Sequence, residues 1–155
     1  MSACTDNNLL PSNAFKVLIG GSLEYPRLNL LAVGLTFPGI SNAEVSSPYR
    51  NREGYVPSET LVYEPLLIRF MCDERLELYD ELFGWMKANT RTNNHQVDDI
   101  TINLLTSHNN ISREVRCTDA FPTSISSVDF DAQSSEVTFA TFDVSFRFDE
   151  FEFID

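Results

Sequence analysis

The chain has 155 residues, of which 43% are hydrophobic, so it is long enough to fold as a single domain over residues 1–155 with a sizeable core. It carries 11 Lys and Arg against 23 Asp and Glu, a formal net charge of −12. This charge balance argues against binding to the phosphate backbone of DNA or RNA, because nucleic-acid binders concentrate Lys and Arg. Cys4, Cys72 and Cys117 lack C-x-x-C spacing and indicate reduced thiols of the cytosol rather than disulfides.

The N-terminus shows neither the basic nor the apolar run of a secretory signal. The longest apolar stretch, residues 28–40, is too short and too interrupted by Gly and Pro to cross a bilayer, so we expect no membrane partner. Residues 1–12 are expected to form a flexible N-terminal arm.

Two strands are predicted next. Phe15, Val17 and Ile19 alternate with other residues and predict a strand that Gly20 closes. Residues 28–37 are apolar on both faces, which predicts a strand covered on both sides.

A long connection, residues 40–58, follows and holds two prolines and a glycine. We expect a long loop or protruding hairpin, with residues 44–58 protruding, and such connections often carry function. Arg50 and Arg52, with Tyr49 and Tyr55 beside them, could pair with acidic surfaces of other copies of this acidic chain. An exposed polar loop without such a role is the alternative.

Residues 59–71 predict a strand that Pro65 disturbs locally. The period then changes to spacings of three and four, which predicts an amphipathic helix at about 74–89. Asp73 is the expected N-cap of this helix. The residues expected to bind the helix to a sheet are Leu76, Tyr79, Leu82, Phe83 and Met86.

The last third of the chain alternates as strands do. Residues 98–107 and 111–121 predict two strands joined by a turn at 108–110, with a break at Phe121-Pro122. A short strand is expected at 127–131. In the terminal strand Phe142, Val144, Phe146 and Phe148 face one way, while Val137 and Phe139 are out of phase and require a bulge near Ala140. An acidic tail, FDEFEFID, would end the chain.

About seven strands and a single helix therefore predict a mainly β fold. The expected architecture is an antiparallel β-sandwich or barrel of two packed sheets with one flanking α-helix, because parallel winding needs helices between most strands.

No pattern for catalysis or metal binding is present. The adjacent carboxylates of Asp73-Glu74 and Asp98-Asp99 point in different directions, so neither pair makes a reliable metal clamp. His95 and His108 stand in loops without ligands at zinc spacing. We expect no enzyme, cofactor or metal site. A ligand-binding β-sandwich module that holds calcium in its acidic loops is an alternative of another class.

The order of these features resembles a known family. In chain order, the segments that carry the likeness are NAFKV, FPGI, SSPYRNREGYVP, LLIRFMCDERLELYDELFGWM, DDITINLL, AFPTSIS and FATFDVSFRFDEFEF. This set, over about residues 13–153, resembles the tail tube protein family of contractile-tailed bacteriophages, which includes tube initiator and tail completion proteins.

The resemblance implies a structural protein of the virion tail, assembled in the host cytoplasm. Six copies would form a homohexameric ring, and stacked rings would enclose a channel through which DNA passes without specific binding. Other partners would be sheath, baseplate or neck proteins. The expected subunit and ring interface comprises Val45, Pro48, Tyr49, Arg50, Arg52 and Tyr55. A tail completion or terminator ring, or the tube of a related contractile injection system, remains the alternative within this class.

Overall fold

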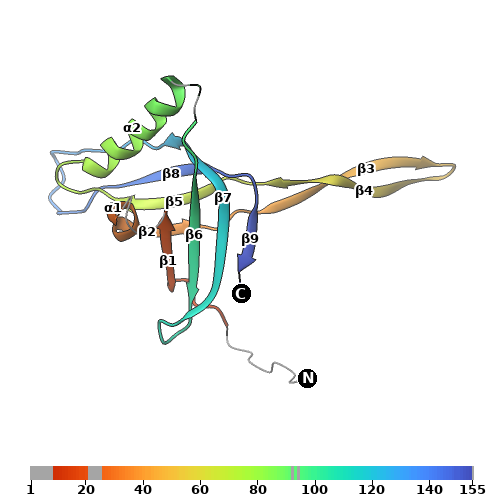
Figure 1. The fold of residues 1–155 in the computed structure, drawn as a ribbon, viewed down its shortest axis with the longest axis horizontal. Helices are drawn as coiled ribbons and strands as arrows, with labels where there is room; N and C mark the ends of the chain where they lie inside the picture. The colour runs from red at the N-terminus through yellow and green to blue at the C-terminus, as the bar shows by residue number, and fades with distance from the viewer. Residues whose placement is uncertain (1–8, 21–25, 92, 94, 155) are drawn as a thin grey trace.

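The computed structural model describes residues 9–20, 26–91, 93 and 95–154 (Figure 1). Nine strands and two helices lie within these residues. In chain order they are β1 (Phe15–Ile19), α1 (Pro26–Leu31), β2 (Ala32–Thr36), β3 (Ile40–Tyr49), β4 (Arg52–Tyr63), β5 (Leu66–Met71), α2 (Glu77–Arg91), β6 (Asp98–Leu105), β7 (Ile111–Ile125), β8 (Thr141–Arg147) and β9 (Phe151–Ile154).

Seven of the strands form two antiparallel layers that share β7. Residues 111–120 of β7 pair with β6, and residues 114–117 also pair with β9; with β1 beside β6, these strands make the first layer. Residues 121–125 of β7 pair with β8, and β5 and β2 follow to complete the second layer. The prediction of a mainly β fold with two packed antiparallel sheets is therefore confirmed.

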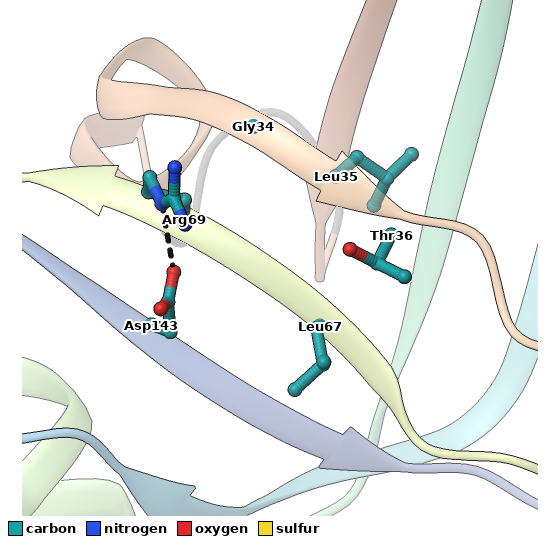
Figure 2. A pocket seen from close by; sticks show the side chains of 6 residues that line it. All are labelled: Gly34, Leu35, Thr36, Leu67, Arg69 and Asp143. Atoms are coloured by element: carbon teal, nitrogen blue, oxygen red, sulfur yellow. Dashed lines mark hydrogen bonds and ion pairs between the residues drawn. The ribbon is translucent and has the colours of Figure 1, made fainter.

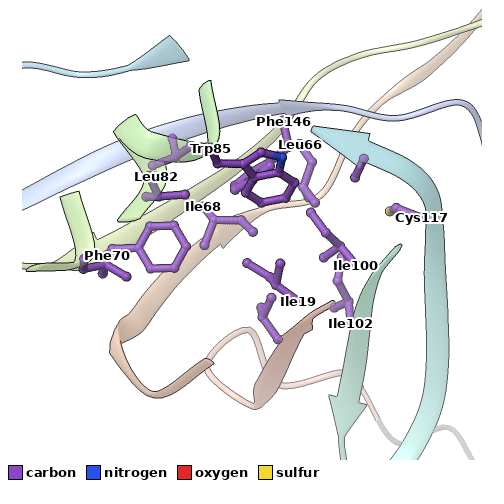
Figure 3. Packing of buried hydrophobic residues seen from close by; sticks show 14 of the residues in the cluster. Ile19, Leu66, Ile68, Phe70, Leu82, Trp85, Ile100, Ile102, Cys117 and Phe146 are labelled. Atoms are coloured by element: carbon purple, nitrogen blue, oxygen red, sulfur yellow. The ribbon is translucent and has the colours of Figure 1, made fainter. Parts of the chain in front are cut away.

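A single apolar core joins both layers and α2 (Figure 3). Period-2 alternation places every second residue of the central strands inside, as expected for sheets with one buried face. The largest fully buried side chains are Phe70, Phe142, Phe146, Ile19, Leu66, Ile68, Leu78, Leu82, Ile100, Ile102 and Val17. The inward alternation predicted for β1 and for the terminal strand is correct.

Helix α2 begins three residues later than predicted, at Glu77, because Leu76 adopts a left-handed conformation with φ of 52°. Its buried stripe is Leu78, Leu82 and Trp85. The prediction that Phe83 faces the sheet was wrong: its ring is 44% exposed and the Lys87 ammonium lies 4.3 Å from its centroid. None of the described helices is long and apolar enough to span a membrane.

The strand predicted at 28–37 is in fact a short helix followed by a strand, so the described chain has two helices rather than one. Proline fits the first position of a helix because its φ is already helical and the missing N–H needs no partner there. Asn29 Oδ1 accepts a hydrogen bond from the Ile19 amide at 2.8 Å and ties this turn to β1.

Three predictions for the C-terminal third also need correction. Strand β7 continues through Phe121-Pro122, where its register against β8 shifts. Residues 127–131 form no strand, and β8 begins only at Thr141, so Val137 and Phe139 lie outside it. The acidic tail contains a ninth strand, β9, because its Phe151 and Phe153 pair with Cys117 and Val115 of β7. The turn predicted at 108–110 is present, with Asn109 at φ of 62°.

Candidate assembly surface

Strands β3 and β4 form a two-stranded sheet that projects away from the two layers (Figure 1). This hairpin extends the ladder of the second layer, because β3 follows β2, β4 precedes β5, and the Glu64 amide donates to the Gly39 carbonyl at 2.9 Å between them. Nearly all of its residues are exposed on both faces. An isolated two-stranded hairpin is marginally stable in water, so this sheet lacks the cover that strands normally have.

The hairpin tip has two chemically different faces. Directly paired residues share a face, so Val45 with Val56 and Tyr49 with Arg52 lie on one side. We call Val45, Val56 and Tyr49 the apolar face of the tip, and Arg52 lies beside Tyr49 on the same side. The opposite side carries Pro48 with Glu53 and Ser46 with Tyr55. Arg50 occupies the turn.

The residues predicted for an interface are thus divided between these faces. Val45, Tyr49 and Arg52 are brought together, whereas Pro48 and Tyr55 point the other way. The Tyr49 ring is 69% exposed, and the Arg52 Cζ lies 5.9 Å from its centroid. The Tyr55 hydroxyl donates to Glu53 Oε2 at 3.1 Å.

The Tyr49 ring lies close to Gly54 of the partner strand. A Cβ added at Gly54 would stand 3.5 Å from Cδ2 of that ring, in ordinary van der Waals contact. The ring therefore lies along the strand surface over Gly54 and beside Arg52, and the outer side of both groups stays exposed.

An aromatic cluster holds the base of the hairpin, and sequence reasoning did not identify it. Phe151 of β9 packs against Phe37 and Tyr63 with ring centroids 5.3 and 5.4 Å apart. It also contacts Phe148 at 6.1 Å and Phe153 at 5.9 Å. The repeated Phe between positions 148 and 153 was the available signal. The cluster connects the C-terminal strand to the hairpin.

Comparison with known proteins gives matches at the level of structure. No protein-family model and no curated protein matches the sequence. A chain of the sheath/tube terminator of the extracellular contractile injection system PVC, in its extended state, matches with a TM-score of 0.75 and 20% identity, over 97% of this chain and 99% of that chain. A chain of the extended PVC sheath-tube complex matches at 0.73 and 20% identity, over 96% and 93%. The tube terminating cap of the anti-feeding prophage matches at 0.74 and 18% identity, over 99% of both chains.

The chain has a tail-tube fold. The matches extend over almost the full length of both partners, so the layers, helix α2 and the β3–β4 segment all fall within the aligned part. The sequence resemblance and the structural likeness therefore agree on the fold.

An ion pair and a shallow hollow lie on the outward side of the second layer (Figure 2). Arg69 Nε donates to Asp143 Oδ1 at 3.0 Å, directly across β5 and β8. This pair lines a surface hollow of about 280 Å³ together with Gly34, Leu35, Thr36 and Leu67. The pair joins β5 to β8 through half-exposed side chains.

Among the described residues, the two cysteines and two histidines lie in different segments of the fold. Burial raises the pKa of the Cys117 thiol to about 12. Burial, and then the nearby charge of Asp73, raises the pKa of Cys72. His95 Nδ1 stands 3.1 Å from the Asn89 carbonyl oxygen, in a surface loop. Within the part of the chain that the structure describes, no three His, Cys, Asp or Glu side chains gather as metal ligands would.

The Asp73 carboxylate lies at the start of α2. Its Oδ2 accepts a hydrogen bond from the Glu77 amide at 3.3 Å, and its Oδ1 lies 3.5 Å from the Leu78 amide nitrogen. These are amides that the helix itself leaves without a carbonyl partner. Asp73 thus has a structural role in this geometry.

Proposed function

We propose that this chain is a ring-forming structural subunit of the tube of a contractile tail. The observation that carries the proposal is the β3–β4 hairpin, which is exposed on both faces, in a chain with a tail-tube fold. Association with further copies would cover the hairpin and the open strand edges. Stacked homohexameric rings provide such cover, because closed repetition removes the edges that would otherwise pair without control.

The interface in this proposal includes Val45, Pro48, Tyr49, Arg50, Arg52 and Tyr55. The apolar face of the tip would provide the buried contact, since aromatic residues and Arg are enriched in the cores of interfaces. Pro48 and Tyr55 on the opposite side would then touch a second neighbour. A hairpin packed between two neighbours uses both of its faces, which suits the exposure of each.

The finer form of the proposal is the tail tube of a contractile bacteriophage, with DNA passing through the channel. The sequence resemblance supports this form, and the net charge of −12 agrees with a wall that does not retain phosphates. Sheath, baseplate or neck proteins would be the other partners, in a tail assembled in the host cytoplasm. A subunit of the tube of a related contractile injection system would have the same structural role, and the tube would carry another cargo.

A terminator ring is a second candidate function. The two terminating proteins match over 97% to 99% of this chain and 99% of their own length. A terminator would form a ring that stops, whereas a tube subunit would polymerise. A tail completion protein at the head-proximal end belongs to this second candidate.

Negative-stain imaging of the purified protein tests both candidates. Long tubes support the tube subunit, and isolated rings that do not lengthen with concentration support the terminator. A uniform 17.6 kDa monomer at all concentrations would contradict both. If the melting temperature of that monomer rose with calcium, the ligand-binding β-sandwich alternative would replace them.

A matched pair of variants tests the role of the hairpin. Val45→Asp places a charge on the apolar face of the tip, and we expect assembly to be lost while the monomer keeps its melting temperature, because this side chain is half exposed. Ile111→Asp, at a site that is 62% exposed, is the control and should assemble normally. Equal assembly of both variants would show that the hairpin is not part of the interface.

A further inference from the structure

Residues 126–140 form an irregular segment at the end of the molecule opposite the hairpin tip (Figure 1). Both ends of this segment are fixed to the body. The Ser126 amide donates to the Asp143 carbonyl at 2.8 Å, and the Cys72 amide donates to the Ala140 carbonyl at 2.9 Å. Val128 packs against the core. The segment is therefore held in place even though it forms no strand.

This segment exposes large apolar side chains between its fixed ends. Phe130, Val137 and Phe139 are 76%, 92% and 75% exposed. Three exposed large apolar side chains within one segment of fifteen residues are a candidate interaction surface, because exposed apolar side chains that gather in one region mark such surfaces. We call residues 126–140 the distal segment.

The charge of the distal segment is opposite to that of the hairpin tip. It contains Asp129, Asp131 and Glu136, all exposed, and no Lys or Arg, so its net charge is −3. The tip, residues 49–53, carries Arg50 and Arg52 against Glu53, a net charge of +1. An acidic apolar surface and a basic apolar surface thus lie at the two ends of the longest axis of one chain (Figure 1).

We propose that the distal segment of one copy receives the hairpin tip of another. This inference rests on the proposed function and names the receiving surface, which neither the fold nor the comparisons identify. The apolar face of the tip packs on Phe130, Val137 and Phe139, while Arg50 and Arg52 reach the carboxylates around them.

The geometry of such a contact suits rings and tubes. The two surfaces differ, so the contact is heterologous, and repeated heterologous contacts generate closed rings or helical stacks. A tip-to-tip contact would place arginines of both copies together, and like charges across an interface oppose association.

Helix α2, which carries Glu77 and Asp80 in its first turn, is a poorer receiver. Its large exposed aromatic side chain, Phe83, is covered by the Lys87 ammonium at 4.3 Å from the ring centroid. The distal segment offers three exposed apolar side chains with carboxylates beside them and no cation of its own.

A charge-exchange experiment tests the pairing, with assembly measured by sedimentation and negative-stain imaging. Arg50→Asp with Arg52→Asp should reduce the assembled fraction by roughly tenfold or more, and so should Asp129→Arg with Asp131→Arg, because each places like charges in contact. Combining all four substitutions in one chain should restore assembly, since the pair is then reversed. Asp80→Arg, on the exposed side of α2, is the control and should assemble as the natural chain does.

The outcomes separate this inference from the proposed function. If the natural chain assembles but the four-fold variant stays as defective as the two double variants, the tip does not meet the distal segment and the inference is overturned alone. Normal assembly of Asp129→Arg with Asp131→Arg overturns it as well. If the natural chain never assembles, both fail.

A photo-cross-linking residue at position 49 gives an independent readout. The assembled protein, prepared from equal amounts of ¹⁵N-labelled and unlabelled chains, should yield mixed-label cross-links between the tip and the tryptic peptide 117–147. This peptide contains the whole distal segment, because no Lys or Arg occurs between Arg116 and Arg147. Mixed-label cross-links confined to other peptides would contradict the inference.

Discussion

The indole Nε1 of Trp85 donates a hydrogen bond to the carbonyl oxygen of Gln96, 2.9 Å away. The same oxygen accepts from Asn89 Nδ2 at 3.2 Å, and Asn89 Oδ1 accepts from the Gln96 amide at 2.8 Å. The last turns of α2 are thereby fixed to the segment that leads into β6. The helix is positioned both by its apolar stripe and by this polar contact.

Trp85→Phe should therefore destabilise the fold by about 1–3 kcal/mol, because it removes one buried hydrogen bond and leaves unfilled volume beside Phe146. Urea denaturation monitored by circular dichroism measures the loss. Phe83→Leu, at an exposed site of the same helix, should stay within about 0.5 kcal/mol of the natural chain. Similar losses for both variants would contradict the contact.

Removing the Asp73 carboxylate should weaken the start of α2. Asp73→Ala is expected to cost about 1 kcal/mol, and Asp73→Asn less, because the amide oxygen can still accept from the Glu77 amide. Hydrogen exchange at Glu77 and thermal unfolding measure the effect. Glu74→Ala, one residue further on and exposed, should leave both unchanged; an equal effect there would indicate a general charge effect instead.

Phe151→Ala should loosen the hairpin base, because it removes four ring contacts at once. We expect a loss near the lower end of the about 3–5 kcal/mol seen for buried Phe, since this ring is only partly buried. Amide exchange should rise in β9 and in residues 37–40 and 60–64, while β1 and β6 keep their protection. Unchanged exchange at the hairpin base would show that the cluster does not hold it.

The raised pKa of Cys117 predicts alkaline sensitivity. The thiol titrates near its ordinary value of 9.0 in the unfolded chain and at about 12 in the folded one. Between these values the folded state binds the extra proton, so stability present below pH 9 is lost as pH rises toward about 12. Lysine and tyrosine side chains also titrate in this pH range. The quantity to measure is therefore the difference between the natural chain and Cys117→Ala in how steeply the free energy of unfolding falls with pH.

The same burial should make Cys117 unreactive toward disulfide reagents at pH 8 until the chain unfolds. Between pH 9 and 12, the free energy of unfolding of Cys117→Ala should fall less steeply with pH than that of the natural chain. Identical slopes, or rapid labelling of Cys117 in the folded protein, would contradict the burial of this thiol.

Sequence reasoning predicted those elements whose patterns are local. The alternation of Phe142, Val144 and Phe146 gives a strand with one buried face, and the switch of period after Met71 gives a helix. The start of that helix was misplaced because the left-handed conformation of Leu76 follows from the surrounding packing and has no signal in the residue type.

The elements that were missed depend on distant partners. Strand β9 exists because β7 offers a free edge opposite Val115 and Cys117, and β7 passes Pro122 because β8 pairs on the far side of the register shift. Residues 127–131 alternate as a strand would, yet they pair with no strand. Local alternation cannot show which edges remain free.

For the candidate site, sequence composition identified the basic and aromatic tip but not its faces. The separation of Tyr49 from Tyr55 follows from the pairing of Tyr49 with Arg52, which the two-residue turn at Arg50 and Asn51 sets. The interface role of these residues stays a prediction. Residues 127–131, and Val137 and Phe139 beyond them, were assigned to strands, so their exposure was not predicted.

The continuity of the hairpin with the second layer has a mechanical consequence. A neighbour that pulls on the tip would pull along β4 into β5 and along β3 into β2, parallel to the strand axes. Such a load is in shear, so it falls on many ladder hydrogen bonds of β2, β5 and β8 together rather than opening them one after another. The hairpin is therefore joined to the body in the direction in which a sheet best resists tension.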